Sequence, residues 1–264
     1  MKAFACFLIL LTFIVRPTCG QEIVTPQLKA STAFIAGETL SYQIKYGFVV
    51  GGTTTLTLSA DTFNNKLAFH ALATGKTTGV ADKIYGVEDI YESWFDPKTN
   101  LPYKSIRNIK EGRYRLYNEV IYDHQNNSVK SKLSGIHNVP KKILDLSSTL
   151  YFLRRIDFSK VSEGDVILIN MYFSDEVFPF YLRYSGKETI RTKIGKIQCI
   201  KISPIVEVGR MFKSEDDLTI WFSDDDNCIP VLVRMDIRIV GSINLKLISY
   251  KNIANPFPFQ TDLP

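Results

Sequence analysis

The alternation of apolar and polar residues with a period of two is the feature that most restricts this chain's fold. Residues 40–46 read LSYQIKY, with an apolar side chain at every second position. Side chains of a β-strand point alternately to its two faces, so this pattern predicts strands with one buried face. It predicts strands at 40–46, 53–59, 66–74, 86–95, 101–110, 113–123, 128–134, 165–173, 178–186, 188–194, 196–205, 216–223, 229–239 and 241–250.

Short turns separate the predicted strands. Glycine adopts the backbone angles that tight turns need, so glycines between alternating segments indicate hairpins. The turns are predicted at Gly51-Gly52, Glu111-Gly112, Gly186-Lys187, Gly195-Lys196 and Gly241.

One segment has helical instead of strand periodicity. Residues 145–157, DLSSTLYFLRRID, carry apolar side chains at 146, 150, 153 and 156. Asp145 is a favourable N-cap, and Arg154 and Arg155 suit the C-terminal end of a helix. We therefore expect about seven strands, one amphipathic helix and about seven more strands.

So many antiparallel strands are expected to curl, because strands twist and exposed edges favour closure. The predicted fold is mainly β: a large curled antiparallel sheet, or an open or half-closed barrel, with one helix packed on it. We expect one β domain over 21–264, or two β halves joined by the helix. A closed outer-membrane barrel is disfavoured, because its lipid face is almost uncharged. Charges stand mid-strand here, at Lys45, Arg183, Lys201 and Arg234.

The first twenty residues have the pattern of a signal peptide. Lys2 precedes an uncharged apolar run of 13 residues, 3–15, which is too short to span a bilayer comfortably. Small residues lead up to Gly20, so we expect cleavage there, a mature chain from Gln21, and a periplasmic or secreted protein. No later run is long enough to predict a transmembrane helix.

Removal of Lys2 and Arg16 leaves 30 basic and 27 acidic residues, a net charge of +3. This charge is too small to indicate a nucleic-acid partner. Two cysteines remain in the mature chain, Cys199 and Cys228. A disulfide between them would close a loop of 29 residues (228 minus 199) and stabilise the fold by about 3–4 kcal/mol. Two separately buried thiols are the alternative.

The acidic stretch Asp224-Asp225-Asp226-Asn227 is predicted to be a turn. Alternating apolar residues before and after it form two strands, and Asp and Asn accept turn dihedrals. A calcium loop would alternate its carboxylates and include a glycine, which this stretch does not.

Motifs for nucleophilic catalysis, metal binding and phosphate binding are not found in the sequence. The three histidines, His70, His124 and His137, are scattered, so we expect no metal site, no cofactor and no assignable catalytic residue. Paired carboxylates remain an alternative, because a glycosidase can draw them from distant strands. Acidic residues that could contribute are Glu88, Asp89, Glu92 and Asp96.

Basic residues gather on the predicted hairpin 101–123, interleaved with tyrosines. Outside the cytoplasm, anionic lipid headgroups or acidic glycans are the partners that such a hairpin suits. An ordinary solvent-facing hairpin is the other interpretation. The residues are Lys104, Arg107, Lys110, Arg113 and Arg115, with Tyr103, Tyr114 and Tyr117.

Aromatic residues spread over several strands suggest an apolar concave side. Filled with side chains, this side is simply core; unfilled, it is a pocket for a lipid or another hydrophobic ligand. Such an architecture is similar in outline to periplasmic lipoprotein carriers. The candidate ligand-binding residues are Trp94, Phe178, Phe180, Tyr181 and Trp221.

Four segments carry a resemblance to a known family. GETLSYQIKYGFVVGGTTTL, DLSSTLYFLRR, YSGKETIRTKIGKIQCIKISP and LTIWFSDDDNCIPV occur in this order. Together they resemble the exported bacterial proteins grouped as domain of unknown function 3108. The resemblance implies an exported, mostly β protein of Gram-negative-type bacteria, with no established activity and no catalytic residues to carry over.

Three hypotheses follow for the function. The first is a non-enzymatic binder of an apolar or amphiphilic envelope component in the concave face. The second is a carbohydrate-acting envelope enzyme with two carboxylates. The third is a structural or assembly partner of another envelope protein, which a large exposed apolar patch would favour.

Overall fold

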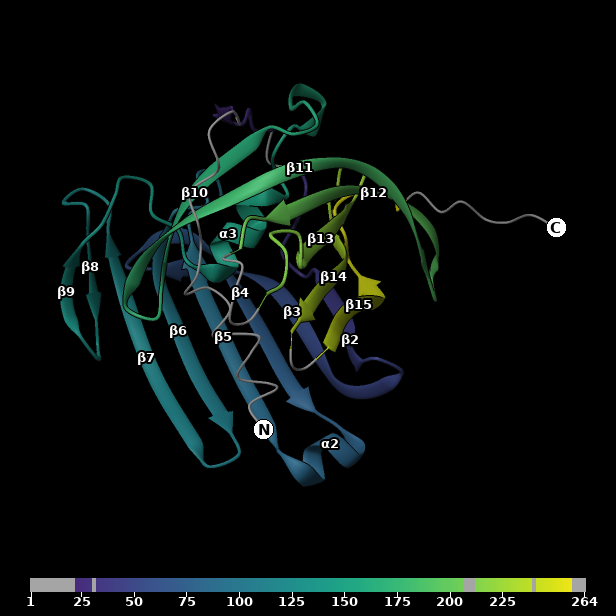
Figure 1. Cartoon of the computed structure of the whole chain (residues 1–264). Coiled ribbons are helices and arrows are strands. Elements are labelled where there is room, and N and C mark those ends of the chain that lie inside the picture. Colours follow the sequence, from purple (N-terminus) through teal and green to yellow (C-terminus); the bar gives the residue numbers. More distant parts are fainter. Residues whose placement is uncertain (1–21, 30–31, 207–211, 239–240, 258–264) are drawn as a thin grey trace.

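Fifteen strands pair into one sheet in the computed structural model, which describes residues 22–29, 32–206, 212–238 and 241–257 (Figure 1). The predicted signal peptide lies outside these residues. The elements are β1 (Ile23–Val24), β2 (Thr39–Tyr46), β3 (Val49–Phe63), β4 (Lys66–Thr77), α2 (Gly79–Ile84), β5 (Val87–Phe95), β6 (Pro102–Glu111), β7 (Tyr114–Asp123), β8 (Ser128–Ser131), β9 (Gly135–Asn138), α3 (Leu146–Leu153), η2 (Phe158–Lys160), β10 (Val166–Phe173), β11 (Glu176–Thr192), β12 (Gly195–Pro204), β13 (Leu218–Ser223), β14 (Pro230–Ile237) and β15 (Gly241–Lys251).

The sheet is curled but not closed, as the alternation predicted. Its order is β1-β10-β11-β12-β13-β14-β15-β2-β3-β4-β5-β6-β7-β8-β9, so the short strands β1 and β9 form the two edges. Neighbours are antiparallel except β1, which lies parallel to β10. β15 pairs with β2, which joins both halves of the chain into one surface. Nine strands precede α3 and six follow it, instead of the predicted seven on each side.

The first hairpin turns earlier than predicted. Gly51 and Gly52 lie inside β3, and the turn is at Gly47 and Phe48. Gly47 has a φ of +53°, which glycine adopts without a steric penalty. The register between β2 and β3 shifts beside the Gly51-Gly52 pair, at Ile44 and Lys45. These two glycines therefore mark a β-bulge instead of a turn.

The predicted turn at Gly186-Lys187 is wrong for the same reason. β11 runs without interruption from Glu176 to Thr192, and its pairing with β12 shifts register between Tyr184 and Lys187. Gly186 has a φ of +83° inside this bulge. A glycine in a strand pattern can mark a bulge as readily as a turn, and the sequence alone does not distinguish them.

The predicted helix is confirmed as α3, and it lies inside the curl of the sheet (Figure 1). Asp145 caps it: its carboxylate accepts a hydrogen bond from the Ser148 amide, and the Ser148 hydroxyl accepts one from the Asp145 amide, both at 2.9 Å. α3 packs against β4, β5 and β10. Polar Ser147, Ser148 and Thr149 are buried along with Tyr151 and Leu153. The helix is thus an internal plug, not an amphipathic cover.

The plug is held by aromatic packing. The Tyr151 ring lies 4.8 Å from the Phe34 ring and 5.2 Å from the Phe95 ring, measured between centroids. Tyr151 belongs to a cluster of buried residues from β2, β3, β4, β5, β11, β12, β13, β14 and β15. Leu153 belongs to a second cluster, with residues of β10, β11, β12 and β13. Helix and strands therefore share their core.

Gly112, in the turn between β6 and β7, gives a direct test of backbone geometry. Its φ is +53°, and a Cβ built there would lie 2.6 Å from Cε2 of Tyr85. We expect Gly112→Ala to lower the free energy of unfolding by about 2 kcal/mol, from the strained φ plus the clash. Urea denaturation would measure it. Gly47 has the same φ with open space around it, so Gly47→Ala should cost about 1 kcal/mol or less. Equal costs would contradict a role for the Tyr85 contact.

Candidate functional site

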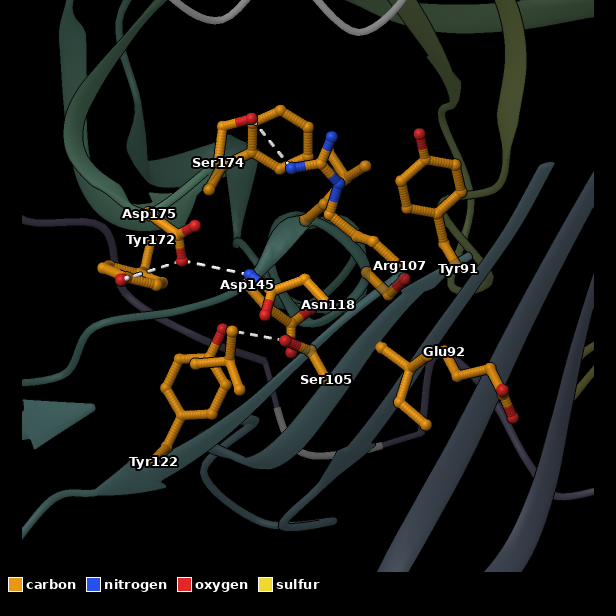
Figure 2. Close-up of a pocket in the computed structure, with 15 residues that line it drawn as sticks. Tyr91, Glu92, Ser105, Arg107, Asn118, Tyr122, Asp145, Tyr172, Ser174 and Asp175 are labelled. Carbon is orange, nitrogen blue, oxygen red and sulfur yellow. Dashed lines mark hydrogen bonds between the residues drawn. The ribbon is translucent and has the colours of Figure 1, made fainter. Parts of the chain in front are cut away.

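A small cavity lined by polar and apolar side chains lies between the concave face of β5–β7, the start of α3 and the β10–β11 turn (Figure 2). Its free volume is about 30 Å³. Strand register places Tyr91, Arg107 and Asn118 side by side on neighbouring strands, because Tyr91 pairs with Arg107 and Arg107 with Asn118. Paired residues share a face of the sheet, so all three side chains point into the curl.

The β10–β11 turn closes this cavity. Ser174 and Asp175 both have positive φ, +54° and +65°. Arg107 donates a hydrogen bond to the Ser174 hydroxyl at 2.8 Å, and the Asn118 amide donates to the Asp175 carboxylate at 3.0 Å. The Arg107 guanidinium also lies 4.2 Å from the centre of the Phe173 ring. These contacts fasten the second half of the sheet to β6 and β7, where no strand pairing joins them.

Two buried donors face this region without a partner among the described residues. They are the Tyr91 hydroxyl and Nε of Arg107. The two groups adjoin each other on paired strands; burial raises the pKa of the Tyr91 hydroxyl, and the smaller effect of the Arg107 charge lowers it. A cavity of about 30 Å³ has room for water and not for a sugar ring or an acyl chain, since ligand pockets usually enclose about 300 Å³ or more.

Asp145 lies at the inner wall of the cavity. Burial raises the pKa of its carboxyl to about 6. Hydrogen bonds from Ser93, Ser147 and Ser148 lower the pKa, but their effect is smaller than that of burial. The Ser93 hydroxyl donates to it at 2.5 Å. Because the carboxyl is fully engaged in capping α3 and tying it to β5, Asp145 is a structural group and not a free acid catalyst.

Two further carboxyls lie on the same concave face, at the start of β5 and the end of β6. Asp89 and Glu111 are both buried. Burial, then the Asp89 charge, raises the pKa of Glu111 to about 7, and burial also raises the pKa of Asp89. A like charge beside a buried carboxyl favours its protonated form. Burial on the concave face keeps both carboxyls from flanking a glycosidic bond in solvent.

The predicted acidic residues are otherwise dispersed. Glu88 forms an ion pair with Lys110 at 3.2 Å, and Glu92 bonds to His70 at 2.9 Å. Asp96 lies beyond the end of β5 and accepts hydrogen bonds from the turn that follows. Among the described residues, no three His, Cys, Asp or Glu side chains are placed to hold a metal ion.

The Asp224–Asn227 stretch is the turn between β13 and β14, as predicted. Asp225 accepts hydrogen bonds from the Ser223 hydroxyl at 2.6 Å and the Cys228 amide at 2.9 Å. The Asn227 side chain exchanges two hydrogen bonds with the backbone of Asn255, at 2.9 Å and 2.8 Å. Every one of these contacts is local or anchors the C-terminal segment, which is a structural role.

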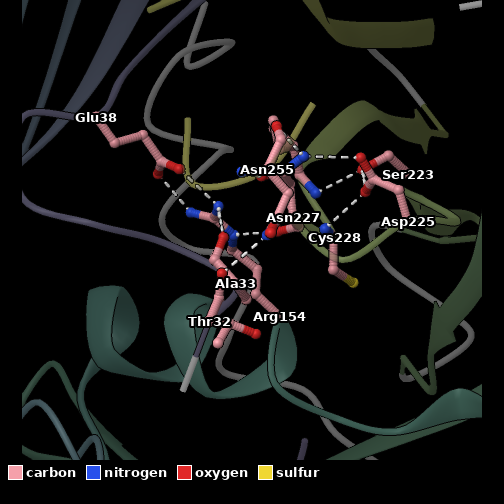
Figure 3. A network of polar contacts seen from close by, with 10 residues as sticks. Thr32, Ala33, Glu38, Arg154, Ser223, Asp225, Asn227, Cys228 and Asn255 are labelled. Carbon is pink, nitrogen blue, oxygen red and sulfur yellow. Dashed lines mark hydrogen bonds and ion pairs between the residues drawn. The ribbon is translucent and has the colours of Figure 1, made fainter. Parts of the chain in front are cut away.

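This turn adjoins a buried ion pair between Arg154 and Glu38 (Figure 3). The guanidinium donates to the two Glu38 oxygens at 2.5 Å and 2.7 Å, and also to the carbonyls of Ala33 and Asn227. Both side chains are almost completely inaccessible, at 0% and 1%. The pair joins the end of α3, the segment before β2 and the β13–β14 turn.

Cys199 and Cys228 are buried free thiols in the structure. Burial raises the pKa of each thiol to about 12, which makes neither a ready nucleophile. The structure therefore has two separately buried thiols, which is the alternative interpretation, and the disulfide stays a prediction.

The five aromatic ligand candidates do not converge on one cavity. Trp94 stacks on His70 with ring centroids 4.1 Å apart and bonds to exposed Asp61. Trp221 is buried, with its indole donating to Glu188 at 3.0 Å. The remaining candidates, Phe178, Phe180 and Tyr181, are buried in three different apolar clusters. Their role as a ligand site stays a prediction.

The predicted basic hairpin is divided between the two faces of the sheet. Arg107 points into the curl, while Lys104 and Lys110 pair with Glu119 and Glu88 on the other face. Arg113 and Arg115 are exposed at the β6–β7 turn. The sequence thus identified basic residues correctly but did not reveal that one of them, Arg107, belongs to the cavity.

An exposed apolar surface, here called the rim patch, lies where β2 meets β3 and where α2 follows β4. Its members are Phe48, Val49, Val50, Val80 and Ile84. Phe48 is fully exposed, and Val49, Val80 and Ile84 are 61%, 69% and 71% exposed. The Thr78 amide donates to the Gly51 carbonyl at 3.0 Å, which holds α2 against the start of β3. No helix among the described residues is long and apolar enough to cross a membrane.

Comparisons with known proteins show what this architecture is similar to. A family model described as "Protein of unknown function (DUF3108)" matches residues 41–248. A β-barrel-like protein of domain of unknown function DUF1849 from Brucella abortus superposes with a TM-score of 0.54 at 10% identity, covering 86% of this chain and 99% of that one. At that identity the similarity shows the fold alone.

Two further solved structures are more distant. A DUF1089 family protein from Pseudomonas aeruginosa has a TM-score of 0.36 at 8% identity, covering 67% of this chain and 87% of that one. A hypothetical protein from Chlamydia trachomatis has a TM-score of 0.37 at 9% identity, covering 90% and 100%. No curated protein matches the chain.

Proposed function

Because the chain belongs to the DUF3108 family of proteins of unknown function, we propose a role from its own geometry: it is an exported, non-enzymatic envelope protein that acts by surface contact. Export is inferred from the charged start and short apolar run of residues 1–20. The rim patch is the single observation that carries the surface role. Soluble proteins seldom expose a fully accessible Phe beside four further aliphatic side chains unless something covers them.

The interior supports this proposal against a carrier of apolar ligands. α3 and the side chains packed on it occupy the concave side, where a carrier would keep its cavity. The cavity beside Arg107 has a free volume of only about 30 Å³. Acyl-chain binding would need several hundred Å³ with an apolar lining.

The carboxyl geometry supports it against a carbohydrate-acting enzyme. Asp89 and Glu111 are both buried, so neither is exposed to flank a glycosidic bond. Asp145 is committed to Ser93, Ser147 and Ser148. These carboxyls stabilise the fold, which leaves the outer surface as the place of action.

Photo-crosslinking in living cells tests the proposal. We expect a benzoylphenylalanine at Val49 to form covalent adducts with an envelope component, lipid or protein, because this position is covered in use. The same probe at Leu67, which is 64% exposed at the opposite end of the strands, should form none. Adducts at neither position, or equal adducts at both, would contradict a surface role of the rim patch.

Native mass spectrometry provides the second readout. Protein purified gently from the envelope should have the mass of the polypeptide from Gln21 alone. A bound mass that organic extraction removes, and that a substitution of Val49 does not affect, would favour an internal carrier instead.

A further inference from the structure

We propose that the rim patch docks onto the anionic surface of a lipid bilayer. This inference rests on the surface role proposed above and names its partner. Three observations carry it: the shape of the patch, the charges around it, and the charges at the other end of the same strands.

The patch is a projecting tip and not a groove. Phe48 occupies the turn between β2 and β3 with Val49 next to it. Val80 and Ile84 are four residues apart in α2, so they share one face of that helix. A turn tip and a six-residue helix are far smaller than the roughly 20–30 residues per side of a stable protein interface. A bilayer needs no complementary shape and accepts a few apolar side chains at the depth of its headgroups.

Basic side chains surround this tip. They come from β2, β4, α2 and the β6–β7 hairpin: Lys45, Lys76, Lys83, Lys110, Arg113 and Arg115. The β6–β7 turn is held beside α2, because the Gly112 amide donates to the Gly86 carbonyl at 2.8 Å. Three exposed acidic residues lie nearby, Asp82, Glu88 and Asp236. Asp82 accepts a hydrogen bond from Thr77, and Glu88 is paired with Lys110. Asp236 pairs across the strands with Ser242, whose carbonyl accepts a hydrogen bond from the Gly47 amide. Positive charge therefore predominates, which suits anionic headgroups.

The opposite ends of the same strands are less basic than the rim patch end. The turns after β3, β5 and β7 are flanked by Asp61, Asp96 and Asp123, and exposed Lys66 and Lys98 lie at the first two of these turns. Hydrogen bonds from Trp94 and Asn126 lower the pKa of Asp61 and Asp123, and hydrogen bonds from Thr99, Tyr103 and Lys98 outweigh burial to lower that of Asp96. The carboxylates offset the lysines at this end, so an anionic surface attracts the rim patch end more strongly.

Vesicle sedimentation tests the inference. Exported protein with its N-terminus verified would be mixed with vesicles of phosphatidylethanolamine and phosphatidylglycerol, or of neutral phosphatidylcholine alone. We expect binding to the anionic vesicles that falls at least about tenfold in Phe48→Ser, since burial of one Phe side chain supplies at least that factor. Arg113→Gln combined with Lys83→Gln should weaken binding to anionic vesicles only, as should a rise from about 50 to about 500 mM salt.

Leu67→Ser is the matched control, because it removes an apolar side chain that is 64% exposed at the opposite end of the strands. It should bind as the unsubstituted protein does. Circular dichroism of Phe48→Ser must be unchanged, as expected for a fully exposed side chain. Equal sedimentation of Phe48→Ser and the parent protein would overturn the inference.

Two other outcomes separate this inference from the proposed function. A dimer in light scattering that Phe48→Ser abolishes would show that a second copy covers the patch and would overturn membrane docking. Absence of vesicle binding together with Val49 crosslinks to protein would also overturn it, while the surface role would stand. Absence of both would reject the two proposals together.

Discussion

Arg154→Met is expected to lower the free energy of unfolding by about 3–5 kcal/mol, because it leaves the Glu38 carboxylate buried without its partner. The carbonyls of Ala33 and Asn227 lose a donor at the same time. The Arg154 guanidinium also packs on the rings of Phe34 and Tyr151, 5.2 Å and 5.3 Å from their centroids. Urea denaturation followed by tryptophan fluorescence would measure the loss.

The combined substitution of both partners separates the charge from the packing. Arg154→Met with Glu38→Leu should be less destabilised than Arg154→Met alone, because no buried charge remains. Arg183→Met is the matched control: Arg183 pairs with Glu215 and Asp216 near the surface, so its loss should cost less than about 1 kcal/mol. A cost below 1 kcal/mol for Arg154→Met would show that the pair does not hold α3 in place.

Much of the sheet could be predicted from the sequence, because the alternation that identifies a strand lies within a few consecutive residues. Alternation in 40–46 identifies β2, and the spacing in 145–157 identifies α3. The Asp224–Asn227 turn could be predicted because polar residues there separate two alternating segments. The family could be recognised because its motifs occur in order over 41–248.

The position of α3 inside the curl could not be predicted in this way. Helical spacing of its apolar residues suggested a helix covering the sheet, but Ser147, Ser148 and Thr149 are buried as well. Their burial depends on Asp145 and Ser93, which lie 52 residues apart in the chain. Likewise, the sequence suggested only that Arg154 is a cation at the C-terminal end of a helix. Its buried partner, Glu38, is 116 residues away in the chain and could not be identified from local pattern.

The same limit applied to the candidate sites. Asp89 and Glu111 meet only because β5 pairs with β6 in one register, and Tyr91 and Arg107 are neighbours for that reason. The rim patch did have a sequence signal. Phe48, Val49 and Val50 are three consecutive apolar residues between glycines, outside the predicted strands 40–46 and 53–59, and such a run does not fit an alternating strand with one buried face.

Titration of the buried carboxyls gives the second large effect, a loss of stability between about pH 4.5 and pH 7. Burial raises the pKa of Glu111 from 4.5 to about 7 and raises that of Asp89 as well. As pH rises through this range, the unfolded chain releases these protons while the folded protein keeps them, so the free energy of unfolding falls. Glu111→Gln removes the ionisation and should raise stability at pH 8 by about 2 kcal/mol, with little change at pH 4.5.

Thermal denaturation across pH 4.5 to pH 8 measures this difference, and the comparison with Glu88→Gln identifies its source. Glu88 is exposed on the other face of β5, the strand that carries Asp89, and it pairs with Lys110, so its substitution should leave the pH profile unchanged. Asp145, whose pKa burial raises to about 6, adds a component of the same sign that persists in Glu111→Gln. The pH profile of Glu111→Gln should therefore become shallower without becoming flat. A profile as steep as that of the unsubstituted protein would show that Glu111 is ionised in the fold at neutral pH.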